Sequence, residues 1–285
     1  MKIDGHTRQL GIIGCPVEHT FSPKLQNFIS GRMGENYVYS AWHVEPEKLA
    51  DAIAGMKALN IRGINVTAPH KKAVMQYLDV ISEQAKLLGS VNTVVNRNGR
   101  LYGYNTDAEG FYAALYNEGI LMEGKNILII GAGGVVKPTL IRIIQENPAS
   151  VTVVNRTKSK VIALKEAIKE QMDFEINTDV KKHDHYDIVI NATSAGMAPQ
   201  LDALPIDDIE EIDNLDFIDK DTAVVDMIYN PKHTRFLKEV RKRGAKTMNG
   251  LGMLIYQGLI AHELFTGNKL PKDMADIVTI EVFRS

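Results

Sequence analysis

The sequence contains a single cysteine, and no apolar run in it approaches the roughly 18 residues that a membrane span requires. One cysteine excludes an internal disulfide framework and a cysteine-rich metal site, and it fits a reducing compartment. The first ten residues are too polar for a signal peptide. We therefore expect a cytoplasmic protein that does not cross a membrane.

Net charge is also small, because 33 Lys and Arg stand against 35 Asp and Glu. A formal charge of −2 offers no field for nucleic acid or an anionic membrane surface. The basic run Lys238 to Lys246 predicts a solvated helix face. The acidic stretch Asp202 to Asp221 predicts a solvated loop with a short helix, whose apolar residues pack inward. These apolar residues are Ile206, Ile209, Ile212, Leu215 and Phe217. The eight histidines lack metal-ligand spacing supported by acids, so no metal is predicted.

The composition and length are those of an ordinary globular protein with room for two domains. Hydrophobic residues make up 45% of the chain and charged residues 24%. A single core usually stops growing at roughly 250 to 300 residues, so 285 residues favour two cores. No internal repeat or low-complexity tract interrupts the pattern.

Short apolar runs alternate with helical patterns in the first third of the chain, which predicts a βαβαβ arrangement and a parallel sheet. Asn98-Gly99 lies between two further apolar runs and predicts a hairpin turn. The expected strands are 10–14, 37–43, 61–66, 91–95 and 101–104, and the expected helices are 23–32 and 46–59.

A second βαβ series follows a predicted helix at 108–118. Its expected strands are rich in Ile and Val, as buried parallel strands should be. They comprise 126–130, 150–154, 188–191 and 223–227, and two more helical segments are expected at 250–264 and 273–283.

Glycines follow the first strand of this second series directly, in Gly131-Ala132-Gly133-Gly134. Such a loop allows a tight turn and lets backbone N–H groups approach a pyrophosphate at a helix N-terminus. Its position between a buried strand and a helix favours a dinucleotide site over an ordinary tight turn. Val136 and Pro138 depart from the usual pattern, and we expect a locally unusual loop.

The end of the next strand carries cations where NAD-binding folds place an acid. The residues are Asn155-Arg156-Thr157-Lys158-Ser159-Lys160. A guanidinium and a hydroxyl suit a 2′-phosphate, so NADP is favoured over NAD, and an exposed basic turn is the alternative. The predicted cofactor contacts are Gly131, Ala132, Gly133, Gly134, Val135, Asn155, Arg156, Thr157, Lys160, Thr193, Met227 and Gly252.

Lys71 and Asp107 precede the glycine loop and form the candidate reacting pair. A carbonyl reduced by hydride develops negative charge on oxygen, and a lysine ammonium can stabilise that charge and supply the proton. The carboxylate would orient the ammonium. On spacing alone, Lys71 would more often be a surface lysine.

At this point the sequence resembles the shikimate dehydrogenase family over essentially its whole length. The resemblance is carried by eight motifs in the family's order. They are Gly14 to Pro23, Asn65 to Lys71, Ser90 to Thr93, Gly103 to Asp107, Asn155 to Thr157, Asn191 to Met197, Asp226 to Pro231 and Gly252 to Gln257.

The resemblance implies NADP-dependent, reversible reduction of 3-dehydroshikimate to shikimate on the chorismate route to aromatic amino acids. It implies Lys71 as acid/base and Asp107 as its partner. It further implies that Thr20, Ser22 and Tyr229 hold the substrate carboxylate. The ring hydroxyls and ketone would be bound by Thr67, Asn92 and Gln257.

Several positions differ from the family pattern. Thr20 stands where Ser is common, which keeps the hydroxyl and adds a methyl, and Gln26 stands where His is common. Thr20 and Ser22 also have a simpler reading as caps of the helix at Pro23. Asn92 and Asn105 can be interpreted more simply as turn residues that bind their own backbone, and His19 as a residue that forms a structural hydrogen bond.

Three alternatives stay open at this stage. A quinate/shikimate dehydrogenase would use the same scaffold with broader substrate and NAD/NADP use. A non-catalytic sensor would bind shikimate-like acids without turnover, although it has no need for a proton donor such as Lys71. A methylenetetrahydrofolate dehydrogenase also pairs a lysine with a dinucleotide module, but the hydroxyl pair Thr20 and Ser22 favours the shikimate interpretation.

We therefore predict an α/β protein of two domains with the active cleft between them. Residues 1–106, completed by C-terminal helices in 251–285, form a substrate domain with a mostly parallel sheet. Residues 107–250 form a Rossmann-type NADP domain. The expected partner is a small molecule, with no nucleic acid and no membrane, and the chain is expected to be a monomer or homodimer.

Overall fold

A computed structural model describes residues 3–180, 185–210, 212 and 214–283. The chain divides into two compact units, Met1–Gly110 with Ile255–Ser285, and Phe111–Leu254. It passes from the first unit to the second within α5 (Asp107–Asn117) and returns within α9 (Leu251–Thr266). The boundaries expected after residues 106 and 250 each precede the observed ones by four residues.

The first unit is built on a six-stranded sheet among its described residues, in the order β2-β1-β3-β5-β6-β4. The predicted βαβαβ start makes β1, β2 and β3 parallel, and β4 is parallel to β6. β5 runs antiparallel to both neighbours, and the predicted hairpin turn at Asn98 (φ 55°) and Gly99 (φ 83°) joins it to β6. The strands are β1 (Arg8–Gly14), β2 (Tyr37–His43), β3 (Gly63–Val66), β4 (Val80–Ile81), β5 (Thr93–Arg97) and β6 (Arg100–Tyr104).

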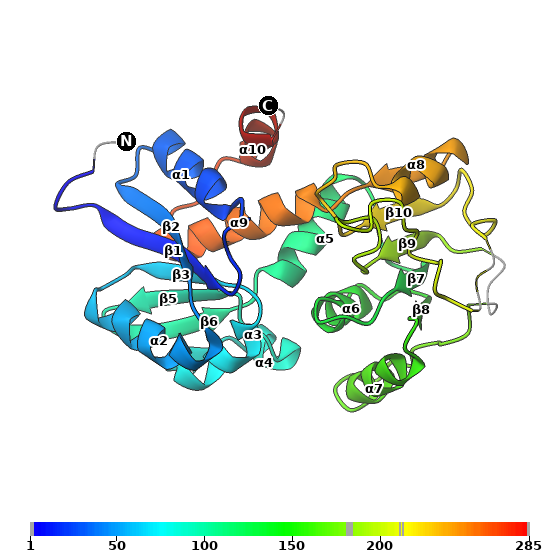
Figure 1. Cartoon of the computed structure of the whole chain (residues 1–285), viewed down its shortest axis with the longest axis horizontal. Helices are drawn as coiled ribbons and strands as arrows, with labels where there is room; N and C mark the ends of the chain where they lie inside the picture. Colours follow the sequence, from blue (N-terminus) through cyan, green and yellow to red (C-terminus); the bar gives the residue numbers. More distant parts are fainter. Residues whose placement is uncertain (1–2, 181–184, 211, 213, 284–285) are drawn as a thin grey trace. The chain divides into compact units, whose positions relative to one another are not determined.

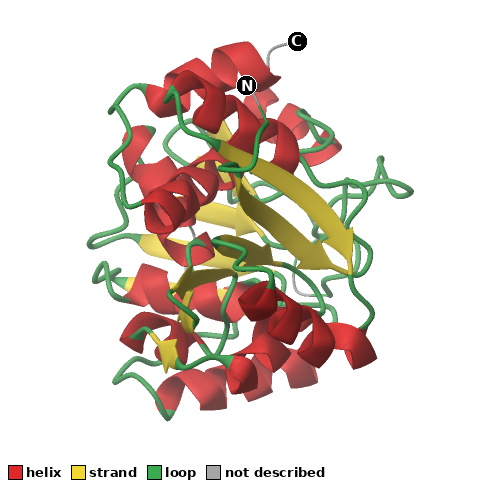
Figure 2. Cartoon of the chain, turned by 90° about the vertical axis from the view of Figure 1, so that its left-hand side faces the viewer, coloured by secondary structure: helices red, strands yellow, loops and turns green. Residues whose placement is uncertain are grey.

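Helices cover both faces of this sheet, as the yellow strands between red helices in Figure 2 show. One face packs against apolar residues such as Ile53 and Met56 of α2, and the other against Ala261 and Phe265 of α9. Both faces are therefore buried, which explains strands that read as nearly continuous apolar runs. The helical segments are α1 (Ser22–Arg32), the 3₁₀ turn Pro46–Lys48, α2 (Leu49–Ala58), α3 (His70–Ala73), the 3₁₀ turn Val74–Tyr77, α4 (Glu83–Leu88) and α10 (Met274–Phe283).

The second unit has a parallel sheet in the order β11-β10-β9-β7-β8. Asn177 adds an isolated parallel bridge to Thr152 of β8. If that bridge is counted as a strand reduced to one residue, the order becomes 3-2-1-4-5-6, which is the dinucleotide-binding order. Its strands are β7 (Asn126–Ile130), β8 (Ser150–Val154), β9 (Ile188–Asn191), β10 (Ala223–Asp226) and β11 (Lys246–Met248). The chain adds strands on one side of β7 up to Asn177 and on the other side from β9 onward, and folds of this kind bind their ligands at that switch point between β7 and β9.

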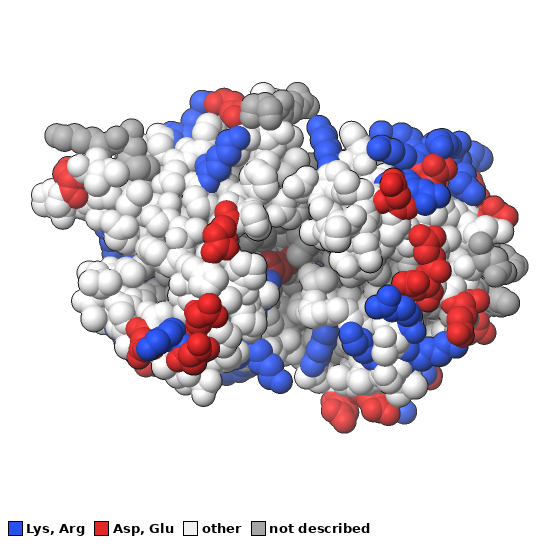
Figure 3. All heavy atoms as spheres, viewed as in Figure 1, with Lys and Arg blue, Asp and Glu red and all other residues white. Residues whose placement is uncertain are grey.

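The core of this unit is completed by its helices and its acidic stretch. The helices α6 (Val136–Ile144), α7 (Lys158–Lys169) and α8 (Arg235–Lys242) are labelled beside the sheet in Figure 1. The described residues of the acidic stretch form turns without the short helix that was predicted. Its apolar residues do pack inward, as expected. In α8, Phe236 and Val240 are buried and the basic residues are exposed. This basic cluster, at the upper right of Figure 3, is the predicted solvated face.

Among the described residues, none of the helices combines the length and the apolar character needed to cross a membrane.

Candidate active site

Lys71 and Asp107 form a direct ion pair in the first unit. The Lys71 Nζ lies 2.7 Å from Asp107 Oδ2, and the two side chains are 35% and 18% exposed. A pair that is half-hidden from water loses less of its attraction to solvent than an exposed one. The alternative of an isolated surface lysine is therefore wrong for Lys71.

The backbone around the pair fixes both side chains. The Lys71 carbonyl accepts a bond from Val91 N (2.9 Å). The Asn105 side chain accepts from Asp107 N (3.0 Å) and Ala108 N (3.4 Å), so it is the turn residue that starts α5. Asp107 is the first residue of that helix, where the helix dipole favours a carboxylate. The pair thus joins an ammonium to an anion held in place by a helix start.

Thr20 and Ser22 lie together at the start of α1. The Thr20 hydroxyl donates to the Ser22 hydroxyl (3.1 Å), and Ser22 N donates to Thr20 Oγ1 (3.2 Å). The N-cap residue of α1 is Phe21, and no side chain caps the helix. Neither hydroxyl belongs to the N-cap residue, although Thr20 Oγ1 accepts a bond from the first N–H group of the helix, that of Ser22.

A buried network of polar side chains leads from these hydroxyls to Asn92. The Ser22 side chain lies beside that of Tyr39, whose hydroxyl donates to Asn65 Oδ1 (2.7 Å). The Asn65 amide donates to Thr93 Oγ1 (3.0 Å), and Thr93 donates to Asn92 Oδ1 (3.0 Å). All five residues are buried, so the network orients predicted substrate residues from behind.

Asn92 is more enclosed than the sequence suggested. Its amide donates to Thr106 Oγ1 (3.0 Å), and its carbonyl accepts from Thr106 N (2.8 Å). With 3% of the residue exposed, most of its bonding capacity serves the chain. Tyr39 carried no signal in the sequence, because a hydroxyl inside a strand reads as ordinary strand composition. Thr93 and Thr106 lie in two of the recognised motifs but were not predicted as site residues.

Thr67 shares the same edge of the sheet. It follows β3, is half-buried, and its N donates to Ile13 O (2.9 Å). Gly14 allows this approach, because a Cβ there would lie 2.3 Å from Thr67 Cγ2. The residues after β1 and β3 are thereby held side by side.

Gln257 and Tyr229 come from other parts of the chain. Gln257 belongs to α9 and is half-buried, and Gly110 of α5 lets the two helices touch there, because a Cβ at Gly110 would meet Gln257 N at 2.5 Å. Tyr229 is half-buried in the second unit, and burial raises the pKa of its hydroxyl. That hydroxyl therefore remains a neutral donor at physiological pH.

The second unit holds a pocket of about 470 Å³ at the carboxyl ends of β7, β8 and β9. Eight of the predicted cofactor residues line it, namely Gly131, Ala132, Gly133, Asn155, Arg156, Thr157, Lys160 and Thr193. Four others, Gly134, Val135, Met227 and Gly252, are not in its lining. Met227 directly follows β10, and Gly252 packs against Ala114 and Met248.

The glycine loop has two kinds of glycine. Gly131 has φ +123°, and a Cβ there would lie 2.9 Å from the backbone of Ala192. Gly133 and Gly134 face open space, where a Cβ would meet no atom of the protein within 4 Å. The first glycine is thus required by the fold, and the other two leave room for a ligand.

Gly131→Ala is expected to cost about 1–3 kcal/mol of folding stability because alanine strains this backbone and meets Ala192. Gly133→Ala is the matched control and should leave stability unchanged. Chemical denaturation of both variants measures the difference. Equal stability of Gly131→Ala and wild type would contradict the role given to Gly131.

The helix that follows the loop tolerates the two unusual residues. Val136 is the first residue of α6 and is buried, and Pro138 lies in the first turn, where a missing N–H costs little. The N-cap residue Val135 makes no side-chain cap bond. The N-terminal N–H groups of α6 are therefore suited to a phosphate.

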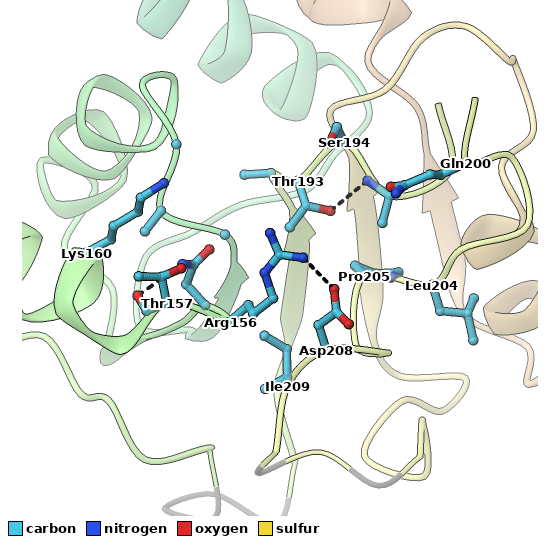
Figure 4. A pocket seen from close by; sticks show the side chains of 16 residues that line it. Arg156, Thr157, Lys160, Thr193, Ser194, Gln200, Leu204, Pro205, Asp208 and Ile209 are labelled. Carbon is cyan, nitrogen blue, oxygen red and sulfur yellow. Dashed lines mark hydrogen bonds and ion pairs between the residues drawn. The ribbon is translucent and has the colours of Figure 1, made fainter. Parts of the chain in front are cut away.

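Arg156 reaches across the pocket in Figure 4 to Asp208, with Arg156 Nη1 2.9 Å from Asp208 Oδ2. Both side chains are largely exposed, so their attraction is weak. Asp208 comes from the acidic stretch and was not predicted as a site residue. One acidic residue in a solvated loop looks like any other in the sequence, so the sequence does not show that Asp208 faces the end of β8.

The buried carboxylate of Asp226 holds the loops that follow β9 and β10 through hydrogen bonds. The Asp226 carboxylate accepts from Asn191 Nδ2 (3.0 Å), Ile228 N (3.0 Å) and Thr234 Oγ1 (2.6 Å). Burial raises the pKa of Asp226, and these three bonds oppose that change. The Asn191 carbonyl in turn accepts from the Thr193 hydroxyl (2.7 Å), so the network places a pocket-lining residue.

Other lining residues also escaped the sequence interpretation. They are Ala192, Ser194, Ala195, Gln200, Leu204, Pro205, Asp208 and Ile209. The first three lie in the recognised motif Asn191 to Met197 and were within reach of the sequence. The last five lie in an irregular segment that periodicity does not place.

Two family models match the chain. The model of the shikimate dehydrogenase substrate binding domain matches residues 12–94, and the model described as shikimate / quinate 5-dehydrogenase matches residues 116–232. A curated relative named shikimate dehydrogenase (NADP(+)), from Caldanaerobacter subterraneus subsp. tengcongensis, is 42% identical over 277 residues, which cover 96% of each chain.

Solved structures give the same result. A crystal structure of a shikimate dehydrogenase in complex with NADP⁺ has a TM-score of 0.88 at 40% identity, covering 98% of this chain and 96% of that one. The enzyme from Thermus thermophilus, in complex with NADP(H) and shikimate, has a TM-score of 0.83 at 31% identity, covering 96% and 99%. The eight motifs, the two-unit fold and these matches agree, and the chain belongs to the shikimate dehydrogenase family.

Proposed function

We propose that this protein catalyses the NADP-dependent, reversible reduction of 3-dehydroshikimate to shikimate in the chorismate route. The observation that carries the proposal is the 2.7 Å pair of Lys71 and Asp107 on a sheet edge crowded with fixed polar groups. A small polyhydroxy acid needs many placed hydrogen bonds and few apolar contacts. The relatives named shikimate dehydrogenase (NADP(+)) support the choice of substrate and cofactor.

Lys71 acts as the acid in the reducing direction. NADPH, when bound, would supply the hydride for the ketone carbon. The Lys71 ammonium donates its proton to the ketone oxygen, where negative charge develops. Asp107 holds the ammonium and accepts a bond from a neighbouring ring hydroxyl. Solvent then reprotonates the lysine. In the reverse direction Lys71 first loses a proton to solvent, and its neutral amine then takes the proton of the substrate hydroxyl.

The remaining predicted residues hold the substrate. The hydroxyls of Thr20, Ser22 and Tyr229 donate to its carboxylate. The ring hydroxyls and ketone are bound by Thr67, Asn92 and Gln257. Because much of the Asn92 amide already bonds to Thr93 and Thr106, its contribution is a single well-placed bond.

The pocket of the second unit fits NADP. The open space beside Gly133 and Gly134 and the uncapped start of α6 suit a pyrophosphate. Arg156, Thr157 and Lys160 line the same pocket and would hold the 2′-phosphate of the adenosine ribose. Val135, Met227 and Gly252 remain proposed contacts to parts of the cofactor that lie beyond this pocket.

The half-buried thiol of Cys15 fits the cytoplasm, which we propose as the location.

Initial rates of oxidation test the proposal, with shikimate or quinate each paired with NADP⁺ or NAD⁺. Shikimate with NADP⁺ should be the fastest combination. Comparable rates with quinate or NAD⁺ would replace the proposal by a quinate/shikimate dehydrogenase of broad specificity. Absence of turnover in a protein that still binds NADP⁺ would replace it by a ligand sensor.

A further inference from the structure

Three side chains that commonly bind metals meet at the carboxyl ends of β1 and β2. These strands are parallel neighbours, and Gly14 pairs with His43 in their register. Cys15 follows β1 directly, His43 ends β2, and Glu45 lies two residues further on. The sheet thus brings together residues that are 28 and 30 positions apart. This separation hides the cluster from any inspection of local spacing.

The ligand atoms of the three side chains are close to one another. Cys15 Sγ lies 3.3 Å from His43 Nε2 and 3.2 Å from Glu45 Oε2, and His43 Nε2 lies 3.0 Å from Glu45 Oε1. Bond lengths of about 2.3 Å to sulfur and about 2.0 Å to nitrogen or oxygen put tetrahedral ligands roughly 3.3–3.6 Å apart. A zinc ion would therefore need these atoms to separate by only a few tenths of an ångström.

A fourth side chain orients the histidine. Glu18 Oε1 lies 2.8 Å from His43 Nδ1. When Nδ1 donates its proton to this carboxylate, the lone pair of Nε2 points to Cys15 and Glu45. A carboxylate behind a ligating histidine is the usual arrangement at zinc sites, where it fixes the ring and increases its basicity.

The backbone that carries the ligands is held independently of any ion. Cys15 N donates to Ala68 O (3.0 Å), and Val44 N donates to Gly14 O (3.0 Å). The buried His70 ring bonds the carbonyl of Val44 (2.7 Å), the residue between His43 and Glu45. The backbone of the ligand residues is therefore already ordered, which lowers the ordering cost of binding.

We propose that Cys15, His43 and Glu45 bind one Zn²⁺ ion, with Glu18 as the positioning residue of His43. Binding forms bonds from the metal to Sγ, Nε2 and a Glu45 oxygen, and the thiol proton leaves to solvent. A water molecule completes the tetrahedron, since His43 and Glu45 are exposed and only three protein ligands are present. The site lies outside the Lys71–Asp107 pair and does not depend on the proposed reaction.

The site has a structural consequence for the first unit. The ion would join the ends of β1 and β2 immediately before the segment that carries Thr20 and Ser22. Because zinc would bind the folded chain, it would raise the melting temperature in proportion to the logarithm of its free concentration.

Calorimetric titration of the metal-stripped, fully reduced protein with zinc chloride tests the proposal. Wild type should bind one equivalent, and Cys15→Ser, a near-isosteric change, should abolish that binding. Glu18→Gln should weaken it by about 10- to 100-fold, as loss of a partner behind a ligating histidine does. His6→Ala removes an exposed histidine elsewhere in the first unit and should change nothing.

Cobalt substitution supplies a second readout that a folding defect cannot imitate. Wild type loaded with Co²⁺ should show the near-ultraviolet band of a cobalt–thiolate bond, which Cys15→Ser should lack while keeping the wild-type melting temperature without metal. Absence of both heat and band in the reduced wild type would overturn the proposal. Equal zinc affinity of wild type, Cys15→Ser and His43→Ala would also overturn it.

Discussion

Lys71→Ala is expected to lower kcat for shikimate oxidation by roughly 100- to 10,000-fold, the usual effect of removing a general acid/base. The variant loses the group that holds the hydroxyl proton as the hydride leaves, and Asp107 loses its partner at 2.7 Å. KM for NADP⁺ should change little, because Lys71 belongs to the first unit and the cofactor pocket to the second. Steady-state rates at saturating NADP⁺ measure both quantities.

The matched control is Lys72→Ala in the same short helix. Lys72 is exposed, and its removal changes the net charge of α3 by the same amount. Its kcat should therefore stay within about twofold of wild type, since exposed charges contribute little. Equal losses in the two variants would show that α3 needs its charge rather than an acid at Lys71.

Asp107→Asn should lower kcat as well, because an amide cannot hold the ammonium by charge.

Arg156→Ala is expected to raise KM for NADP⁺ by about 10- to 150-fold while leaving KM for NAD⁺ nearly unchanged. A charged hydrogen bond of roughly 1.5–3 kcal/mol to the 2′-phosphate accounts for this range. Arg156 lines the pocket at the end of β8, where an NAD-binding chain would carry an acid. Initial rates with each cofactor at fixed shikimate give the ratio.

Two further variants separate the 2′-phosphate from general effects of charge. Lys158→Ala removes a neighbouring cation that pairs with Glu210 and lies outside the pocket lining, and it should not alter the ratio. Asp208→Asn removes the carboxylate that pairs with Arg156 and should tighten NADP⁺ binding by up to about fivefold, the value of an exposed ion pair. A rise in KM for both cofactors in Arg156→Ala would instead indicate a role in pocket shape.

Strands with strong apolar patterns were predicted well from the sequence. The limits of β2, β7, β8 and β9 agree with the expected ones. The missed strands β4 and β11 have two and three residues, which is too short for a periodic signal. Asn177 contributes one bridging residue to the sheet, and only pairing with Thr152 reveals it.

Site residues to which a sequence motif gives a role were predicted. Residues whose hydrogen-bond partners come from distant strands were not. Lys71 and Asp107 stood out because they precede a glycine loop, the resemblance to the family implied their roles, and the structure joins them in an ion pair. Tyr39 and Asp226 act through buried hydrogen bonds formed by strands distant in sequence. A linear pattern does not record such partners, and the same reason explains why Cys15 and His43 were not recognised as a pair.

The most direct test of the account follows a deuterium atom from NADPH labelled at the transferable C4 position of its nicotinamide ring. The protein is mixed with this cofactor and 3-dehydroshikimate, and the product is analysed by NMR. The account predicts shikimate with one deuterium on the reduced carbon, formed at least about a hundredfold more slowly by Lys71→Ala. Unlabelled 3-dehydroshikimate recovered after cofactor binding has been verified would contradict hydride transfer by this protein.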